Sequence, residues 1–121
     1  MRVAGQSCIC ANRIFVQESI AAHFIPAFID RVRAIKVGDG LQPGVEVGPL
    51  INEATLHKVE SLVQDAVAKG AQVAVGGQRL RTKELSKGWF YAPTVLQATP
   101  HRPGGALADA QSPAAYQSDP P

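Results

Sequence analysis

The feature that most restricts how this chain can fold is a capped amphipathic helix expected between residues 52 and 70. Asn52 is a good N-cap, because its short side chain can accept a hydrogen bond from a backbone N–H in the first turn. Gly70 can end the helix, since glycine readily adopts the left-handed conformation of a C-terminal stop. One face between them is apolar, and it consists of Leu56, Val59, Leu62, Val63, Ala66 and Val67. A helix with one apolar face must pack against a second layer.

Three other segments have the composition of strands. Residues 13–17 are rich in β-branched and aromatic side chains and predict a short, largely buried strand. Residues 71–75 predict an apolar strand that ends at Gly76 and Gly77, and residues 89–96 predict a further strand or extended segment with aromatic anchors. The order strand, helix, helix, strand predicts an α/β fold in which a parallel sheet is covered by helices.

A first helix is expected directly after residues 13–17. Glu18 and Ser19 offer an N-cap, and apolar residues then recur at three- and four-residue spacing. This stripe consists of Ile20, Phe24, Phe28, Val32 and Ile35. Pro26 is unfavourable inside a helix, because it removes one hydrogen bond and clashes with a carbonyl, at about 3 kcal/mol. We therefore expect a kink at Pro26, or a helix whose regular part begins later than Ser19.

Two segments are expected to lack regular structure. Residues 36–52 contain several glycines and prolines and predict a long surface loop. This loop lacks the G-x-G-x-x-G grouping and the preceding strand of a dinucleotide-binding fingerprint, so a structural role is favoured. Residues 100–121 are rich in proline and have only Leu107 and Tyr116 as larger apolar residues. Such a segment cannot bury enough surface to order itself, so we expect a disordered tail.

The composition argues against several classes of function. The net charge of +2 comes from Lys and Arg scattered among acidic residues, which gives no basic face for nucleic acid. No apolar run approaches the ~20 residues of a membrane span, and the residues after Met1 lack the layout of a signal peptide. The histidines, His23, His57 and His101, are scattered, so no metal site is expected. The expected partner is a small molecule or another protein.

A cysteine near the start follows a segment that can turn tightly. Gly5 carries no Cβ, which allows a tight turn and a close approach of the backbone to a ligand. Cys8 is then expected at a turn or a short helix start, where unpaired N–H groups and a helix dipole favour the thiolate and can receive an oxyanion. A lone cysteine is more often a buried small side chain than a catalyst, so spacing alone leaves both interpretations open.

Several motifs in the chain are similar to one enzyme family. The run Gly5-Gln6-Ser7-Cys8, followed by Ala11-Asn12-Arg13-Ile14-Phe15-Val16-Gln17, resembles the active-site cysteine segment of the NAD(P)-dependent aldehyde dehydrogenases. An Arg six residues before this cysteine and a second cysteine two residues after it are similar to the succinate-semialdehyde dehydrogenase branch of the family. Arg2 and Cys10 occupy these two positions. Val3 is a departure, because the family usually has Asn there.

The resemblance extends well beyond the cysteine segment. It continues through Val47-Gly48-Pro49-Leu50-Ile51-Asn52, through Gly76-Gly77 and through Tyr91-Ala92-Pro93-Thr94-Val95-Leu96. It implies that residues 1–99 form part of an aldehyde dehydrogenase catalytic domain, and that residues 100–121 are a tail outside it.

The resemblance also implies a chemistry, in which a thiolate attacks an aldehyde, the adduct gives a hydride to a nicotinamide, and water releases the acid from a thioester. Cys8 matches the nucleophile, and its own N–H is a natural oxyanion donor. Arg2 matches the residue that holds the far carboxylate of succinate semialdehyde through two parallel hydrogen bonds. A solvated Arg2 near a ragged N-terminus is the alternative.

Cys10 is a redox candidate by the same resemblance, since it could close a disulfide with Cys8 and block the nucleophile. A disulfide needs Cα atoms about 4.4 to 6.8 Å apart, so closure over one intervening residue requires backbone movement. The alternative is that Cys10 is a small buried side chain. Two cysteines this close cannot join distant parts of a fold, which favours a reducing compartment, and we expect a cytoplasmic protein.

The family's nucleotide-binding domain, its general-base glutamate and its side-chain oxyanion donor precede the cysteine, and no match to them is found here. NAD or NADP is therefore the cofactor by resemblance alone, without identified binding residues, and we expect this chain by itself to be inactive. One alternative is a non-catalytic remnant that associates with itself or with a full-length relative. The other is a small thiol-redox protein that uses Cys8 and Cys10.

Overall fold

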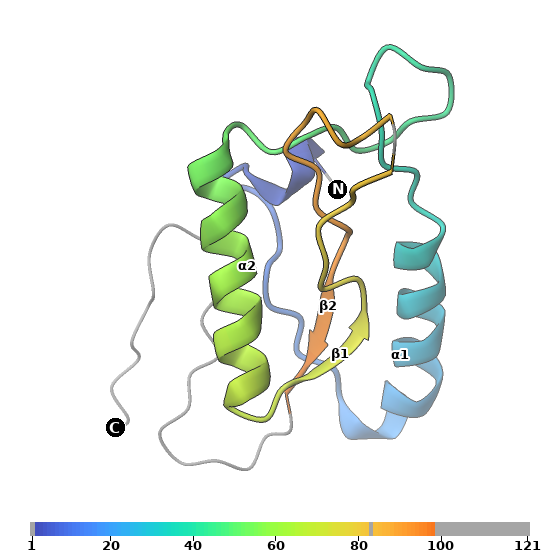
Figure 1. Ribbon diagram of the computed structural model, residues 1–121. Coiled ribbons are helices and arrows are strands. Elements are labelled where there is room, and N and C mark those ends of the chain that lie inside the picture. Colours follow the sequence, from blue (N-terminus) through green and yellow to red (C-terminus); the bar gives the residue numbers. More distant parts are fainter. Residues whose placement is uncertain (1, 83, 99–121) are drawn as a thin grey trace.

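The computed structural model describes residues 2–82 and 84–98, which form a short N-terminal segment of 3₁₀ type with left-handed backbone angles at Val3 and Ala4, two α-helices and a two-stranded sheet (Figure 1). The elements are η1 (Arg2–Gly5), α1 (Glu18–Arg33), α2 (Glu53–Ala68), β1 (Gln72–Val75) and β2 (Val95–Gln97). In Figure 1, α1 and α2 flank the sheet on its two sides, so the α/β composition is confirmed. The predicted disordered tail, residues 100–121, lies outside the described residues.

The sheet itself differs from the prediction, because β1 and β2 pair in antiparallel fashion. Its register places Gln72 opposite Gln97, Val73 opposite Leu96 and Val75 opposite Val95. A single antiparallel bridge between Arg79 and Tyr91 follows the same hairpin-like return of the chain. The prediction of a parallel sheet is therefore wrong for this part of the chain. It depended on counting residues 13–17 as the first strand of a parallel crossover unit.

Residues 13–17 do not form the buried strand that their composition predicts. They belong to an extended segment without a strand assignment, and Phe15 is 94% exposed and Ile14 49% exposed. A strand is stable only when a neighbouring strand takes up its backbone hydrogen bonds. Residues 2–82 and 84–98 contain no such neighbour for this segment, so its strand propensity is not expressed.

Helix α2 matches the prediction closely, because the signals that define it are local. The side-chain oxygen of Asn52 accepts a hydrogen bond from the Thr55 N–H at 2.8 Å, and Gly70 has the left-handed φ of +98°. Leu56 is fully buried. The buried face also includes Val59, Val63 and Ala66, whereas Val67 is 45% exposed, so the apolar face is narrower than predicted.

Helix α1 is present, but its start and its burial differ from the prediction. It begins at Glu18 after Gln17, whose side chain makes no cap bond, and it continues through Pro26 without a late start. The rings of Phe24 and Phe28 stack with their centroids 5.8 Å apart. Of the predicted stripe only Val32 is buried within α1, because α1 meets β1 near its C-terminal end, where Arg33 approaches the Ala74 carbonyl at 3.5 Å.

Residues 36–52 form the predicted loop, and it is closed by a short pairing near its base. The Gly38 N–H donates to the Val47 carbonyl at 3.0 Å, and the Glu46 N–H donates to the Lys36 carbonyl at 2.9 Å. Val37 and Val47 form an isolated parallel bridge. None of the helices in the part of the chain that the structure describes is long and apolar enough to cross a membrane.

The hydrophobic core joins the N-terminal segment to α2 and to the residues before β2. Its buried members are Ala4, Val47, Leu50, Leu56, Val59, Val63 and Tyr91, and Ile35, Val37, Trp89 and Leu96 pack against them. Ala4 is therefore the core residue that fixes the position of the segment leading to Cys8.

Candidate functional site

Successive residues with positive φ bend the chain immediately before the cysteine. The φ angles are 47° at Val3, 53° at Ala4 and 81° at Gly5. Glycine adopts this conformation without strain, as predicted, but a β-branched residue such as valine rarely does. Ala4 and Gly5 are both buried, so the bend is held against the core while the chain beyond it turns outward.

Gln6 fastens this bend to the start of α2. The Val3 carbonyl accepts hydrogen bonds from both the Gln6 backbone N–H at 3.0 Å and the Gln6 side-chain amide at 2.9 Å. The side-chain oxygen of Gln6 accepts a hydrogen bond from the Ile51 N–H at 3.0 Å. One side chain thus links η1 to the residue before the helix cap. Sequence analysis missed this role, since the contact spans 45 residues and has no local signal.

Cys8 lies in the turn that follows, where the Cys10 N–H donates to the Ser7 carbonyl at 3.0 Å. The prediction of a turn is confirmed. No helix begins at Cys8, so the helix dipole that was expected, together with unpaired N–H groups, to favour the thiolate does not act here. Cys8 is exposed, Cys10 is half-buried, and no disulfide joins them. The Cys8 N–H donates to no acceptor among the described residues, which leaves it able to bind an oxyanion.

Arg2 is placed only by its backbone, which begins η1 six residues before Cys8. Its side chain lies outside what the structure describes, so its approach to a substrate carboxylate stays a prediction.

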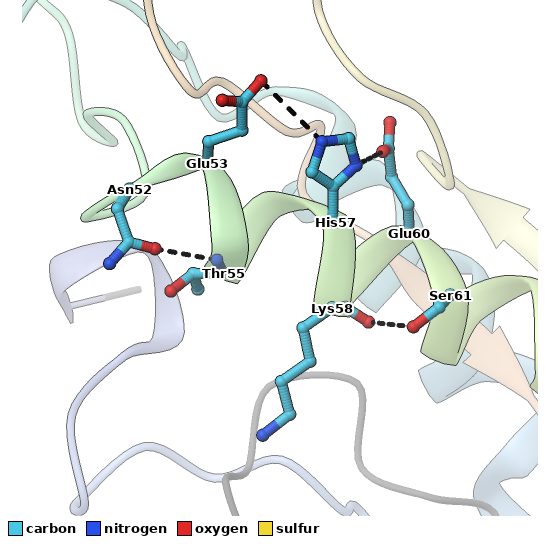
Figure 2. Close-up of polar contacts among 7 residues, drawn as sticks. All are labelled: Asn52, Glu53, Thr55, His57, Lys58, Glu60 and Ser61. Atoms are coloured by element: carbon cyan, nitrogen blue, oxygen red, sulfur yellow. Dashed lines mark hydrogen bonds and ion pairs between the residues drawn. The ribbon is translucent and has the colours of Figure 1, made fainter.

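The first two turns of α2 carry exposed polar pairs (Figure 2). His57 lies 3.7 Å from a Glu53 oxygen and 3.4 Å from a Glu60 oxygen. The side chains of His57 and Glu53 are more than half exposed, and surface pairs of this kind contribute at most about 1 kcal/mol. The described ranges hold no group of three or more potential metal ligands that converge. The spacing of residues 53, 57 and 60 was the available signal for these pairs.

An open depression of about 300 Å³ lies on another part of the surface. Its lining residues come from α2 and from the segments around β1 and β2, and they are Glu60, Gln64, Gly77, Gln78, Arg79, Arg81 and Tyr91. The Arg79 guanidinium lies 5.8 Å from the centre of the Trp89 ring. Burial, and then the charge of Glu60, raise the pKa of the Tyr91 phenol. Neither cysteine lines this depression, so it is separate from the Cys8 turn.

Comparison with known proteins agrees with the resemblance seen in the sequence. The model of the aldehyde dehydrogenase family matches residues 1–104. A protein named probable succinate-semialdehyde dehydrogenase [NADP(+)], from Sinorhizobium fredii, is 50% identical over 95 residues. The mitochondrial succinate-semialdehyde dehydrogenase of Arabidopsis thaliana is 48% identical over 96 residues.

A solved structure is similar as well. Betaine aldehyde dehydrogenase from Staphylococcus aureus, in complex with NAD+, superposes with a TM-score of 0.74 at 45% sequence identity. These three matches cover 78%, 79% and 77% of this chain, but only 18%, 17% and 18% of the relatives. The chain therefore spans less than a fifth of their length. Because the family match extends over most of its residues, this chain belongs to the aldehyde dehydrogenase family.

Proposed function

We propose that residues 1–99 are the nucleophile-bearing part of an NAD(P)-dependent aldehyde dehydrogenase that oxidises succinate semialdehyde to the acid, with Cys8 as the nucleophile. The observation that carries this proposal is the turn at Ser7–Cys10, which exposes the Cys8 side chain and leaves the Cys8 N–H without an acceptor among the described residues. A thiol and an oxyanion donor on one residue suit attack on a carbonyl.

The chemistry assigned to the chain itself is formation of a carbon–sulfur bond. The Cys8 thiolate attacks the aldehyde carbon, and the electron pair of the C=O double bond moves onto oxygen. The Cys8 N–H faces the charge that develops on that oxygen and stabilises it. Gln6 holds the turn against Ile51, which keeps the sulfur and the N–H in one arrangement before the substrate arrives.

Arg2 is proposed as the anchor for the far carboxylate of the substrate. Its backbone lies at the start of η1, six residues before Cys8 in the chain. A guanidinium can hold a carboxylate through two parallel hydrogen bonds, and succinate semialdehyde carries a carboxylate at the end opposite to its aldehyde. The names of the Sinorhizobium and Arabidopsis relatives support this choice of substrate.

The cofactor, when bound, would accept the hydride that leaves the aldehyde carbon. The described residues do not form a cradle for it, because the glycine-containing loop at 36–52 follows helix α1 rather than a strand and has no G-x-G-x-x-G run. We assign the binding of NAD or NADP, and the base that activates water, to residues other than those that the structure describes. The NADP(+) in the Sinorhizobium name and the NAD+ in the Staphylococcus structure support the cofactor class.

The isolated 121-residue chain is expected not to reduce NAD+ or NADP+ with succinate semialdehyde at a measurable rate. Positioning of the two reactants contributes about 7 to 11 kcal/mol to such reactions, and nothing in the described residues holds the nicotinamide. The absorbance of reduced cofactor measures the rate, with Cys8→Ala as the matched control. Cofactor reduction that disappears in Cys8→Ala would contradict the assignment of the missing parts to another region.

A further inference from the structure

The open depression beside α2 has the size and the lining of a site for a small polar molecule. Its volume is about 300 Å³, and apart from Gly77 every residue that lines it has a polar side chain. The amides of Gln64 and Gln78 can each donate and accept hydrogen bonds. Whether such a hollow suits a particular ligand depends on which of its charged and polar groups lack a partner within the protein.

The two arginines of the depression have no acidic partner among the described residues. The Arg79 guanidinium is half-buried over the Trp89 ring, 5.8 Å from its centre, and a contact with a ring face leaves the N–H groups available. The Arg81 side chain is exposed and forms no hydrogen bond or ion pair with residues 2–82 and 84–98. Glu60, the acidic residue of the lining, lies 3.4 Å from His57 instead.

Tyr91 adds a hydroxyl from a side chain that is almost enclosed by the protein. Tyr91 is 9% exposed and belongs to the hydrophobic core with Val59, yet its hydroxyl forms no hydrogen bond with another described residue. Tyr91 and Glu60 both line the depression, and the charge of Glu60 acts on the phenol, so the hydroxyl end faces this hollow. Burial and Glu60 raise the pKa of the phenol, so at neutral pH it keeps its proton and can donate.

We propose that this depression binds a small monocarboxylate, and that Arg79, Arg81 and the Tyr91 hydroxyl hold its carboxylate. Guanidinium groups bind carboxylates through short, charge-assisted hydrogen bonds. Two guanidinium groups and the Glu60 carboxylate leave one positive charge in the lining, which balances one negative charge of a ligand. The second charge of a phosphate group would have no partner and would lie in the same small depression as Glu60.

This site is independent of the proposed function, because neither cysteine lines it. The test uses the full 121-residue chain and gluconate, a monocarboxylate that carries hydroxyl groups. Glucitol, which has the same carbon skeleton and no carboxylate, is the neutral match. Trp89 is the single tryptophan of the chain and lies against Arg79, so its fluorescence reports on the site. The amide NMR shifts of residues 77–81 give a second readout.

Gluconate should bind saturably with a dissociation constant of about 1 mM or lower, whereas glucitol should bind at least about tenfold more weakly. The absence of a saturable change in both readouts up to about 10 mM gluconate would overturn the proposal. Equal binding of gluconate and glucitol would also overturn it, because the carboxylate would then contribute nothing.

Arg81→Gln should raise the dissociation constant of gluconate at least about tenfold. Arg31→Gln is the matched control, because Arg31 is an exposed arginine of α1, which lies across the sheet from α2 in Figure 1. It removes the same charge and should change binding by less than about twofold. Both side chains are exposed, so neither substitution should unfold the chain. Equal effects of the two would show a general attraction of anions to the chain and would refute a built site.

The class of ligand is tested with inorganic phosphate at about pH 8, where it carries close to two negative charges. Phosphate should bind about threefold or more weakly than gluconate, and Glu60→Gln should reduce this difference, because it removes the opposing charge. Phosphate binding as tight as that of gluconate, or a difference that Glu60→Gln leaves unchanged, would contradict the assignment to a monocarboxylate.

Discussion

Val3 is the residue whose backbone conformation suits its side chain least. Its φ of 47° and ψ of 43° lie in the left-handed region, where a β-branched side chain is strained, and its carbonyl is the double acceptor for Gln6. The bend that presents Cys8 therefore includes a residue whose side chain disfavours the backbone conformation that the bend requires. Asn tolerates this region better than valine, and Asn is also the residue that the family usually has at this place.

Val3→Asn is expected to raise the free energy of unfolding by about 1 kcal/mol, because strain of this type costs about 1–3 kcal/mol. Urea denaturation measures the change. Ile9→Asn is the matched control, since Ile9 and Val3 are both 70% exposed and φ is positive at Val3 but not at Ile9. The control should change stability by less than about 0.5 kcal/mol. Equal effects of the two substitutions would show that strain at Val3 is not the cause.

Cys8 and Cys10 differ in accessibility although they are two residues apart. Cys8 is exposed, whereas Cys10 is half-buried and its backbone N–H donates a hydrogen bond to the Ser7 carbonyl. Brief treatment with iodoacetamide should therefore alkylate Cys8 at least about fivefold faster than Cys10, since reaction requires access to the sulfur. Mass spectrometry of the peptide that contains both residues gives the ratio. Preferential labelling of Cys10 would count against Cys8 as the nucleophile.

At the scale of elements, a helix or strand was predicted correctly where the residues that determine it lie within the element itself. The cap at Asn52, the apolar face of α2 and the stop at Gly70 are encoded within the helix itself, and all three are found. The strand at residues 13–17 needs a partner, and no described residue provides one. Its composition is correct for a strand, but its structure depends on a neighbour that the prediction had to assume.

The candidate site was predictable to a similar degree. The tight turn at Gly5 and the exposed turn at Cys8 follow from glycine and from short-range sequence, and both are found. The bond between Gln6 and Ile51 could not be predicted, because residues 45 positions apart become neighbours only through the packing of the core. The antiparallel pairing of β1 and β2 was missed for the same reason.

Tyr91, in the segment before β2, should make the free energy of unfolding depend on pH. Burial and Glu60 raise the pKa of Tyr91 above its ordinary value of about 10, so the folded state keeps the phenol proton at pH values where the unfolded state loses it. Stability falls with rising pH wherever the folded state binds more protons. This contribution is therefore fully present below about pH 10 and is lost as the pH rises through the raised pKa.

Tyr91→Phe should remove that loss, so its free energy of unfolding should decline less steeply above about pH 10 than that of the unchanged chain. Urea denaturation at a series of alkaline pH values measures both slopes. The comparison cancels the titration of lysines, which both proteins share. Identical slopes would show that Tyr91 does not titrate differently in the folded and unfolded states.

At the scale of the whole molecule, the chain spans less than a fifth of the length of its relatives, and several of its large apolar side chains, among them Phe15 and Leu41, are exposed. Cys8 and its N–H are the proposed nucleophile and oxyanion donor, and the proposal assigns the binding of the cofactor to residues other than those that the structure describes. A cytoplasmic location and homo-oligomerisation stay predictions. The central claim is that Cys8, and not Cys10, is the residue that attacks the aldehyde once the missing parts are supplied.

The most direct test of this claim replaces the 95 matched residues of the Sinorhizobium relative with the corresponding residues of this chain and follows reduction of NADP+ by succinate semialdehyde. Turnover should fall by about 10³-fold or more in Cys8→Ala and should stay within about tenfold in Cys10→Ala. The assay is run with Val3 and with Val3→Asn. A loss of turnover caused by strain at Val3 can then be distinguished from a loss caused by the absence of a nucleophile. Turnover that survives Cys8→Ala, or that is absent from the chimera in both Val3 backgrounds, would contradict the account.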